Sequence, residues 1–263
     1  MAQTPKIPIT DKHRREMSPE RDFPGPTPVK MRYAILSSPR SGSTLLGRIL
    51  YETKLAGDPQ EYFNPPLIAL ERQTTGKEKM GINQFMTRME RRRTSPNGVF
   101  GMKVHYSQML GTLSANESKP DVGRFLQVWN KLIWIRRRDR IGQAISQAIG
   151  AHTNVWSSED SRFEREPDVK VHPYDCVAAL NIVARDDAAW EHVLQQAGLP
   201  VHEVWYEDLV ADYENQTRAV LRFLGIDDQV AQVPKQPIEK QGGALNERLR
   251  SELHAYLGLP PVA

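Results

Sequence analysis

The stretch Tyr33-Ala-Ile-Leu-Ser-Ser-Pro-Arg-Ser-Gly-Ser-Thr-Leu-Leu-Gly-Arg-Ile-Leu50 decides the fold of this chain. Its apolar start, residues 33–36, predicts a buried strand, and the small polar residues of 37–42 predict a tight turn. The apolar residues within 45–50 then recur at helical spacing. The order is therefore strand, small-residue loop and helix.

This loop and the start of the helix suit an anion. The first N–H groups of a helix have no partner within the helix, and the helix dipole adds positive potential there. Three hydroxyl side chains add hydrogen-bond donors, and one guanidinium adds a full charge. An ordinary strand–turn–helix with a capping serine is the plainer alternative. The predicted anion site consists of Arg40, Ser41, Gly42, Ser43, Thr44 and Leu45.

The loop departs from the Walker loop of ATPases and kinases. A Walker loop ends Gly-Lys-[Ser/Thr], and its Lys binds the β- and γ-phosphates. Here the corresponding run is Gly42-Ser43-Thr44, and the positive charge comes earlier, at Arg40. This difference argues against a phosphotransferase, which we keep as an alternative.

Length and composition limit the possible classes of protein. The 263 residues fit one α/β domain with additions, and the net charge of +3 requires no nucleic-acid partner. The single cysteine, Cys176, cannot form an internal disulfide, and no apolar leader or membrane-spanning run is present, so we expect a cytoplasmic protein. Residues 1–30 are charged and contain several prolines, which predicts a flexible N-terminal tail before a single domain over 31–263.

Four short blocks carry a resemblance to a known enzyme family. Pro39–Leu46, after a strand, resembles the 5′-phosphosulfate loop of sulfotransferases. Gly57-Asp-Pro-Gln-Glu-Tyr-Phe63 is similar to the Gly-Glu-Pro-Gln-Glu-Phe-Phe run of the bacterial trehalose sulfotransferases, and Val99–Lys103 and Ile135–Ser146 resemble segments of sulfotransferases as well. The chain departs from the family pattern at Asp58, His105 and Arg138.

The resemblance implies a P-loop-like, three-layer α/β fold with a central, mostly parallel sheet flanked by helices. It also implies a sulfotransferase that moves a sulfuryl group from 3′-phosphoadenosine 5′-phosphosulfate to a hydroxyl of a carbohydrate: a trehalose-like disaccharide, a glycolipid or another glycan. The product nucleotide would be adenosine 3′,5′-bisphosphate, no metal would be needed, and the protein would form a homodimer. Two alternatives are a P-loop kinase-like phosphotransferase and a non-catalytic module that binds nucleotides or sulfated glycans.

Two side chains are candidates for the general base that removes the acceptor proton. The resemblance gives this role to Glu61, which is otherwise an acid in a surface turn. His105 ends the strand predicted at 99–105, and its Lys-x-His context looks like the Lys-Thr-His of animal cytosolic sulfotransferases, whose His is the base. A hydrogen-bonded structural histidine is the alternative. The predicted acceptor contacts are Gln60, Glu61, Tyr62, Phe63, Lys103, His105 and Trp156.

A run of arginines follows the strand predicted at 132–135. Like charges side by side are unfavourable unless an anion or an acid lies near them, and a planar guanidinium suits a phosphate. The resemblance implies that Arg137 and Ser146 bind the 3′-phosphate of the donor, with Arg138 as the rival in the next register. Lys240, in a basic, glycine-rich turn, is a further predicted contact. The plain alternatives are surface arginines and a hinge loop.

Helices and strands alternate along the rest of the chain. The triplet Arg91-Arg92-Arg93 ends a helical stripe and is typical of a solvated helix C-terminus. Gly198 and Gly225 follow two helical stretches and predict where these helices stop. Apolar periodicity predicts two helices within 66–93, helices around 125–129, 141–149, 177–194, 213–224 and 245–253, and strands at 99–105, 132–135 and 201–206.

Overall fold

The computed structural model describes residues 9–116, 121–158, 160, 162–164, 167–234 and 243–260. Four parallel strands form one sheet of order β2-β1-β3-β4. Their bounds are β1 Met31–Ser37, β2 Val99–His105, β3 Lys131–Arg136 and β4 Val201–Trp205. At the carboxyl end, Ser37 of β1 pairs with His105 of β2 and with Ile135 of β3. The segments that leave these strands therefore meet at one edge of the sheet, where ligands of open α/β sheets bind.

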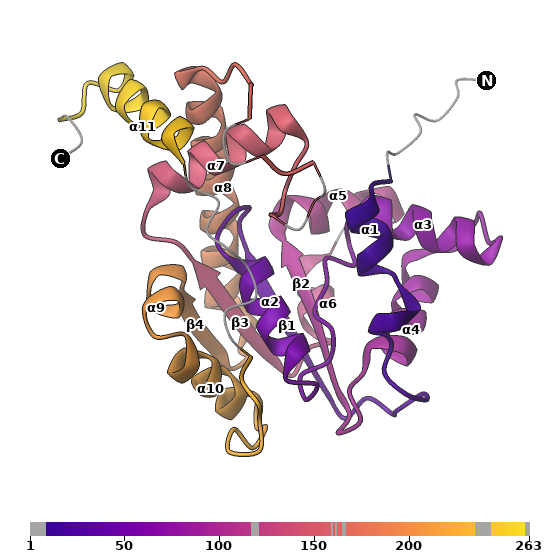
Figure 1. Ribbon diagram of the computed structural model, residues 1–263. Helices are drawn as coiled ribbons and strands as arrows, with labels where there is room; N and C mark the ends of the chain where they lie inside the picture. The colour runs from indigo at the N-terminus through magenta and orange to yellow at the C-terminus, as the bar shows by residue number, and fades with distance from the viewer. Residues whose placement is uncertain are drawn as a thin grey trace.

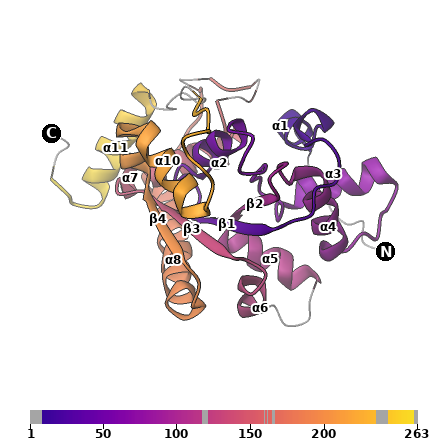
Figure 2. The ribbon, with the colours of Figure 1, turned by 90° about the horizontal axis from the view of Figure 1, so that it is seen from below.

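Helices cover both faces of the sheet, as Figure 2 shows from below. One face carries α5 (Tyr106–Asn116), α6 (Val122–Leu126) and α8 (Pro173–Ala197), and the other carries α2 (Ser43–Glu52) and α10 (Tyr213–Leu224). Alternate side chains of each strand feed two separate apolar cores, because successive residues of a strand point to opposite faces. This arrangement confirms the predicted three-layer α/β fold.

Further helices surround these layers. Beside β2 lie α3 (Pro65–Thr75) and α4 (Ile82–Arg93), while α9 (Tyr206–Ala211) directly follows β4. Above the carboxyl edge of the sheet, α7 (Arg140–Thr153) and α11 (Ala244–Tyr256) pack with α8 around a third apolar cluster that contains Cys176 (Figure 1). None of the helices in the described ranges is long and apolar enough to cross a membrane.

The structure confirms the predicted strands and most of the predicted helices. Gly198 and Gly225 both adopt the left-handed conformation at the ends of α8 and α10, as expected of helix-stopping glycines. The helices α5 and α9 were not predicted. In α5 the buried apolar side chains are Met109 and Leu113, one helical turn apart, and such a short stripe gives little periodic signal.

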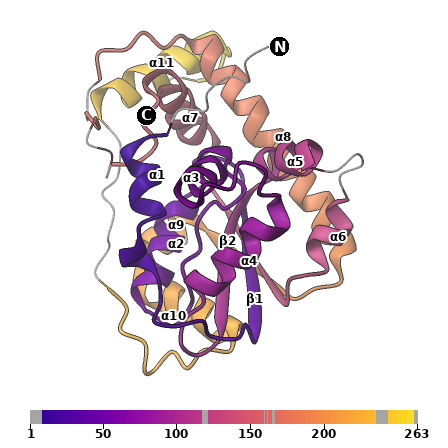
Figure 3. The same cartoon turned by 90° about the vertical axis from the view of Figure 1, so that its right-hand side faces the viewer.

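The N-terminal strap, which we define as residues 9–30, differs from the flexible tail that the sequence predicts. It contains the helix α1 (Asp11–Glu16) and the single turn η1 (Pro19–Arg21), and Met17 is buried in the main core. Figure 3 shows α1 beside α3. A single domain over 31–263 stays a prediction, and residues 1–8 lie outside the described residues.

Buried charges fasten the strap to the sheet. Asp58, which is fully buried, accepts hydrogen bonds from Arg21 at 2.9 and 2.5 Å and from Arg93 at 2.8 Å. Arg92 binds Asp22 of the strap and Glu71 of α3. The prediction that this arginine run is a solvated cap is therefore wrong for Arg92 and Arg93, because acids from distant segments surround them.

We predict that Asp58→Ala strongly destabilises the protein. The substitution leaves two guanidinium groups without their shared partner, and breaking a buried pair in this way costs about 3–5 kcal/mol. The matched control is Glu90→Ala, which removes the partly exposed pair with Arg32 at 2.7 Å and should cost less than about 1 kcal/mol. Urea unfolding of both variants measures the difference, and equal losses would contradict the role given to Asp58.

Candidate functional site

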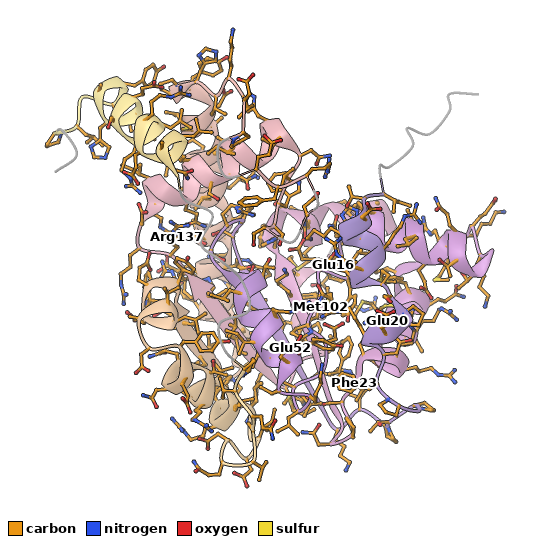
Figure 4. The ribbon with its side chains drawn as sticks, viewed as in Figure 1. Glu16, Glu20, Phe23, Glu52, Met102 and Arg137 are labelled. Carbon is orange, nitrogen blue, oxygen red and sulfur yellow. The ribbon has the colours of Figure 1, made fainter. Side chains whose placement is uncertain are left out.

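A cleft of about 820 Å³ lies at the carboxyl edge of the sheet. Its walls come from the loop after β1, the residues after β2 and β3, helix α7 and the N-terminal strap. In Figure 4, the labelled Arg137 and Glu16 lie toward this end of the sheet, whereas Glu52 and Phe23 lie toward the other end. The cleft therefore joins segments that are far apart in the sequence.

The loop between β1 and α2 offers unsatisfied donors to the cleft. No side chain caps the N-terminus of α2, and the buried hydroxyl of Ser41 has no hydrogen-bond partner. Gly42 has φ 94°, and a Cβ there would lie 2.4 Å from the ring of Tyr206. Ser43, Thr44 and the adjacent Leu45 line the cleft. An anion would satisfy these donors, which supports the predicted anion site.

Arg40 holds the loop against α7. Its backbone is left-handed, with φ 62°, and its side chain donates to Ser146 Oγ at 2.9 Å and to the main-chain oxygen of Trp156 at 2.5 Å. Burial and the nearby charge of Arg137 lower the pKa of Arg40 to about 10, so the guanidinium remains charged at neutral pH. The predicted residues Arg40, Ser146 and Trp156 thus meet in one wall of the cleft.

The structure separates the two rival arginines. Arg137 lines the cleft, lies 5.0 Å from the ring centroid of Tyr206, and has a buried Nε atom without a hydrogen-bond partner. Arg138 instead points to Asp208, with contacts of 2.5 and 2.8 Å, and does not line the cleft. The acid partner explains why a second arginine is tolerated outside the cleft. Lys240 lies outside the described residues.

Arg250 of α11 adds a positive charge that the sequence analysis did not identify. It lines the same side of the cleft and donates to Asp139 at 2.7 Å. Asp139 also caps α7 through the N–H of Gly142 and contacts Arg137 at 3.3 Å. One carboxylate therefore orients two arginines toward the cleft, and an incoming anion would find both in place.

Glu61 lies on the opposite side of the cleft, among donors. Its Oε1 atom is 2.9 Å from Lys103 Nζ and 3.3 Å from His105 Nε2, and its Oε2 atom accepts from Gln108 at 3.3 Å. Burial opposes ionisation of Glu61, but the charge of Lys103 and the contact with His105 outweigh it and hold the pKa of Glu61 well below its usual range. The group is therefore a carboxylate at neutral pH.

Lys103 and His105 connect Glu61 to the sheet and the loop. Lys103 is 2% exposed, and its ammonium group also donates to Thr44 Oγ1 at 2.9 Å. The second ring nitrogen of His105, Nδ1, is 3.0 Å from Ser37 Oγ. Both His105 nitrogens are thus engaged, whereas Glu61 Oε2 has a single long hydrogen bond.

Four predicted acceptor contacts do not line the cleft: Lys103, which contacts the cleft residues Glu61 and Thr44 from behind, and three residues of the loop around Glu61. Gln60 donates to Asp58 and forms a bridge with Met102 beside β2, Tyr62 is fully buried against Phe100, and Phe63 packs on Phe125. The prediction is wrong for these residues because the strap and α4 close over the loop, so its aromatic rings fill the core. Glu61, between them in sequence, points the other way.

Several residues of the cleft were missed by the sequence analysis. Ser107 and Gln108 come directly after the carboxyl end of β2, so the strand-end rule could have identified them. Lys12 and His13, in α1, gave no sequence signal at all. Among the described residues, no group of three or more His, Cys, Asp or Glu is arranged to hold a metal ion.

One family model covers most of this chain. The model of the Stf0 sulphotransferase family matches residues 32–250. A trehalose 2-sulfotransferase of Mycolicibacterium smegmatis is 25% identical and is aligned over 80% of this chain and 89% of its own. A second, from Mycobacterium tuberculosis, is 26% identical over 87% and 97%. A sulfotransferase structure from Alicyclobacillus acidocaldarius covers 88% of this chain and 97% of its own, with 13% identity and a TM-score of 0.48.

We predict that Lys103→Met raises the pKa of Glu61. In the wild type, burial is outweighed mainly by Lys103, so without this charge the effect of burial should dominate. A ¹³C NMR titration of the Glu61 carboxyl carbon measures the change, with the exposed Lys77→Met as the control. An unchanged pKa in Lys103→Met would contradict the assignment.

The same variant should alter how stability depends on pH. In the wild type the pKa of Glu61 is lower in the folded than in the unfolded state, so its contribution is present above the unfolded-state pKa and is lost as the pH falls through the folded-state pKa. Lys103→Met should weaken or reverse this acid-side dependence, which urea unfolding at several pH values measures. An unaltered dependence would show that other carboxylates dominate it.

Proposed function

The chain belongs to the Stf0 sulphotransferase family, and from this premise we propose that it transfers a sulfuryl group from 3′-phosphoadenosine 5′-phosphosulfate to a hydroxyl of a carbohydrate. Family membership identifies the chain as a sulfotransferase and confirms the resemblance seen in the sequence. The two curated relatives are trehalose 2-sulfotransferases, which supports a trehalose-like disaccharide as the acceptor. The observation that carries the proposal is a carboxylate, Glu61, facing an uncapped helix N-terminus across one cleft.

The donor half of the cleft fits an anionic nucleotide. The orphaned Ser41 hydroxyl and the uncapped N-terminus of α2 would hold the 5′-phosphosulfate, together with Ser43 and Thr44. Arg137, with its unpartnered Nε, and Ser146 would hold the 3′-phosphate. Arg138 does not belong to this set, because its guanidinium already forms an ion pair with Asp208.

Glu61 is the proposed general base. Its Oε2 atom faces the cleft with one weak hydrogen bond, whereas both nitrogens of His105 are bonded to other groups. His105 then acts as a positioning residue that fixes the carboxylate through Oε1. A carboxylate that is ionised at neutral pH can accept the proton of a sugar hydroxyl while the new bond forms.

The proposed step is an in-line exchange at sulfur. The donor supplies the sulfuryl group. The bond from the acceptor oxygen to sulfur forms, the bond from sulfur to the bridging phosphate oxygen breaks, and Glu61 takes the hydroxyl proton. Arg40 and Lys103 stabilise the negative charge that develops at the donor end, since both are held in place before the reaction. Preorganised charges of this kind commonly supply the largest part of catalysis.

We predict that the protein binds adenosine 3′,5′-bisphosphate and that Arg137→Ala weakens this binding about 10- to 150-fold, the effect of losing charged hydrogen bonds. Arg138→Ala, the matched control next to it, should change the dissociation constant by less than about twofold, because an exposed pair contributes little. Isothermal titration calorimetry measures both, beside ATP with Mg²⁺. Tight binding of ATP with Mg²⁺ and none of the bisphosphate would refute the donor assignment.

We predict that Glu61→Gln lowers kcat by about 10²- to 10⁴-fold, as expected for the loss of a general base. His105→Asn should lower kcat less, because it only loosens the carboxylate. Transfer of ³⁵S-labelled sulfuryl groups to trehalose is the assay. A larger loss in His105→Asn than in Glu61→Gln would make the histidine the base.

The pH profile gives an independent test of the base. Since the pKa of Glu61 is held well below its usual range, kcat/KM should stay constant as the pH falls from neutral and should decline only below the range of an ordinary glutamate. In Lys103→Met this decline should move to higher pH. A decline near neutral pH in the wild type would instead indicate an imidazole.

A further inference from the structure

We propose that the N-terminal strap determines which acceptor the enzyme takes, and that Lys12 and His13 of α1 contact the acceptor sugar. The inference rests on the proposed function and adds an element to it, since the strap precedes residues 32–250, the part of the chain that the family model matches. The strap nevertheless forms one wall of the cleft, through Thr10, Lys12 and His13. A wall outside the family's shared part is a suitable place for specificity that differs between relatives.

The strap is held firmly enough to act as a wall. Met17 is buried in the core, and Arg21 makes the paired hydrogen bonds to the buried Asp58. The main-chain N–H of Phe23 donates to the main-chain oxygen of Arg92 at 2.9 Å, and the guanidinium of Arg92 donates to the main-chain oxygen of Met17 at 2.9 Å. These contacts lie on both sides of η1, directly after α1, so they fix the position of α1 over the cleft.

His13 presents a hydrogen-bond donor to the cleft. Its Nδ1 atom accepts from the main-chain N–H of Thr10 at 3.1 Å, as part of the capping box of α1. Burial lowers the pKa of His13, so the ring is neutral at neutral pH. A neutral ring that accepts at Nδ1 carries its proton on Nε2. This N–H can donate to a sugar oxygen beside the base.

Lys12 brings a charge close to the reaction centre. Its side chain is 14% exposed and is paired with Glu16, one turn further along α1, at 2.7 Å. Burial lowers the pKa of Lys12, but the carboxylates of Glu16 and of Glu61 outweigh this effect and raise it. Lys12 therefore remains protonated and acts electrostatically on the proposed base, from a position in the cleft wall.

The groups around Glu61 suit a neutral acceptor that carries several hydroxyls. Asn64 and Gln108 line the cleft beside the strap residues and can both donate and accept hydrogen bonds. The two lysines near Glu61 are already paired with acids of the protein, Lys12 with Glu16 and Lys103 with Glu61 itself. An anionic acceptor would not find an unpaired positive charge on Lys12 or Lys103, whereas a polyol would find hydrogen-bond donors on both sides of the Glu61 carboxylate.

The experiment compares four point variants with sulfuryl transfer to trehalose as the probe reaction. His13→Gln and His13→Glu both keep an oxygen for the capping box, but only Gln keeps an N–H donor. Lys12→Met removes the charge and keeps most of the side-chain volume. Arg14→Ala changes the exposed side of the same short helix and is the control. Donor affinity is measured separately by calorimetry with adenosine 3′,5′-bisphosphate.

We expect the KM for trehalose to rise about 2- to 10-fold in His13→Glu and Lys12→Met, the effect of losing a hydrogen bond. Arg14→Ala should stay within about twofold of the wild type, the KM of His13→Gln should rise less than that of His13→Glu because the N–H donor is kept, and bisphosphate affinity should be unchanged in all four. An unchanged trehalose KM in both His13→Glu and Lys12→Met would overturn the inference.

Two further outcomes separate the inference from the proposed function. If the wild type binds no adenosine 3′,5′-bisphosphate, the proposed function fails and the inference falls with it. If the bisphosphate binds but trehalose is not sulfated, hydrolysis of the donor by water is the readout. A fifth variant, Lys12→Ala, should then raise this hydrolysis several-fold over Arg14→Ala, because truncating the side chain opens the wall to water, and equal hydrolysis would overturn the inference.

Discussion

One ammonium group links the two halves of the site. Lys103 Nζ contacts the Glu61 carboxylate and the Thr44 hydroxyl at the same distance, 2.9 Å, and its side chain is almost completely buried. Burial disfavours the charged form of Glu61, and the charge of Lys103 is the largest of the effects that hold the pKa of this carboxyl low. The loop that would hold the donor and the proposed base are thus both bonded to a single side chain of β2, an edge strand of the sheet. The remaining contacts of the cleft refine this arrangement.

The parallel sheet explains why such distant residues meet. Glu61 reaches the edge from the loop that bridges to β2, Arg137 from the end of β3, and Tyr206 from the end of β4. Because all strands run in one direction, every carboxyl end contributes to the same cleft. Tyr206 then packs so closely on Gly42 that the loop and the last strand must adopt their positions together.

The sequence predicted those parts of the molecule whose cause is local. The strand, loop and helix around Gly42 follow from residues within one stretch, and so does the proposal of an anion site there. Local patterns could not predict which side chains are buried by segments that lie far away in the sequence. From the sequence, Tyr62 and Phe63 resemble aromatic residues that bind a ligand, but in the structure the strap and α4 cover them. Arg93 likewise resembles a solvated helix cap in the sequence, but in the structure it pairs with Asp58. The strap itself shows no apolar periodicity, because ion pairs, main-chain hydrogen bonds and a few scattered apolar contacts hold it.

The order in which the strap finds its partners follows from the same ion pairs. Arg21 precedes Asp58 by 37 residues, and Asp22 precedes Arg92 by 70. During synthesis the strap leaves the ribosome before these partners, and it cannot form these ion pairs until α4 has emerged. This wall of the cleft is therefore made before its partners and docks only after they have formed.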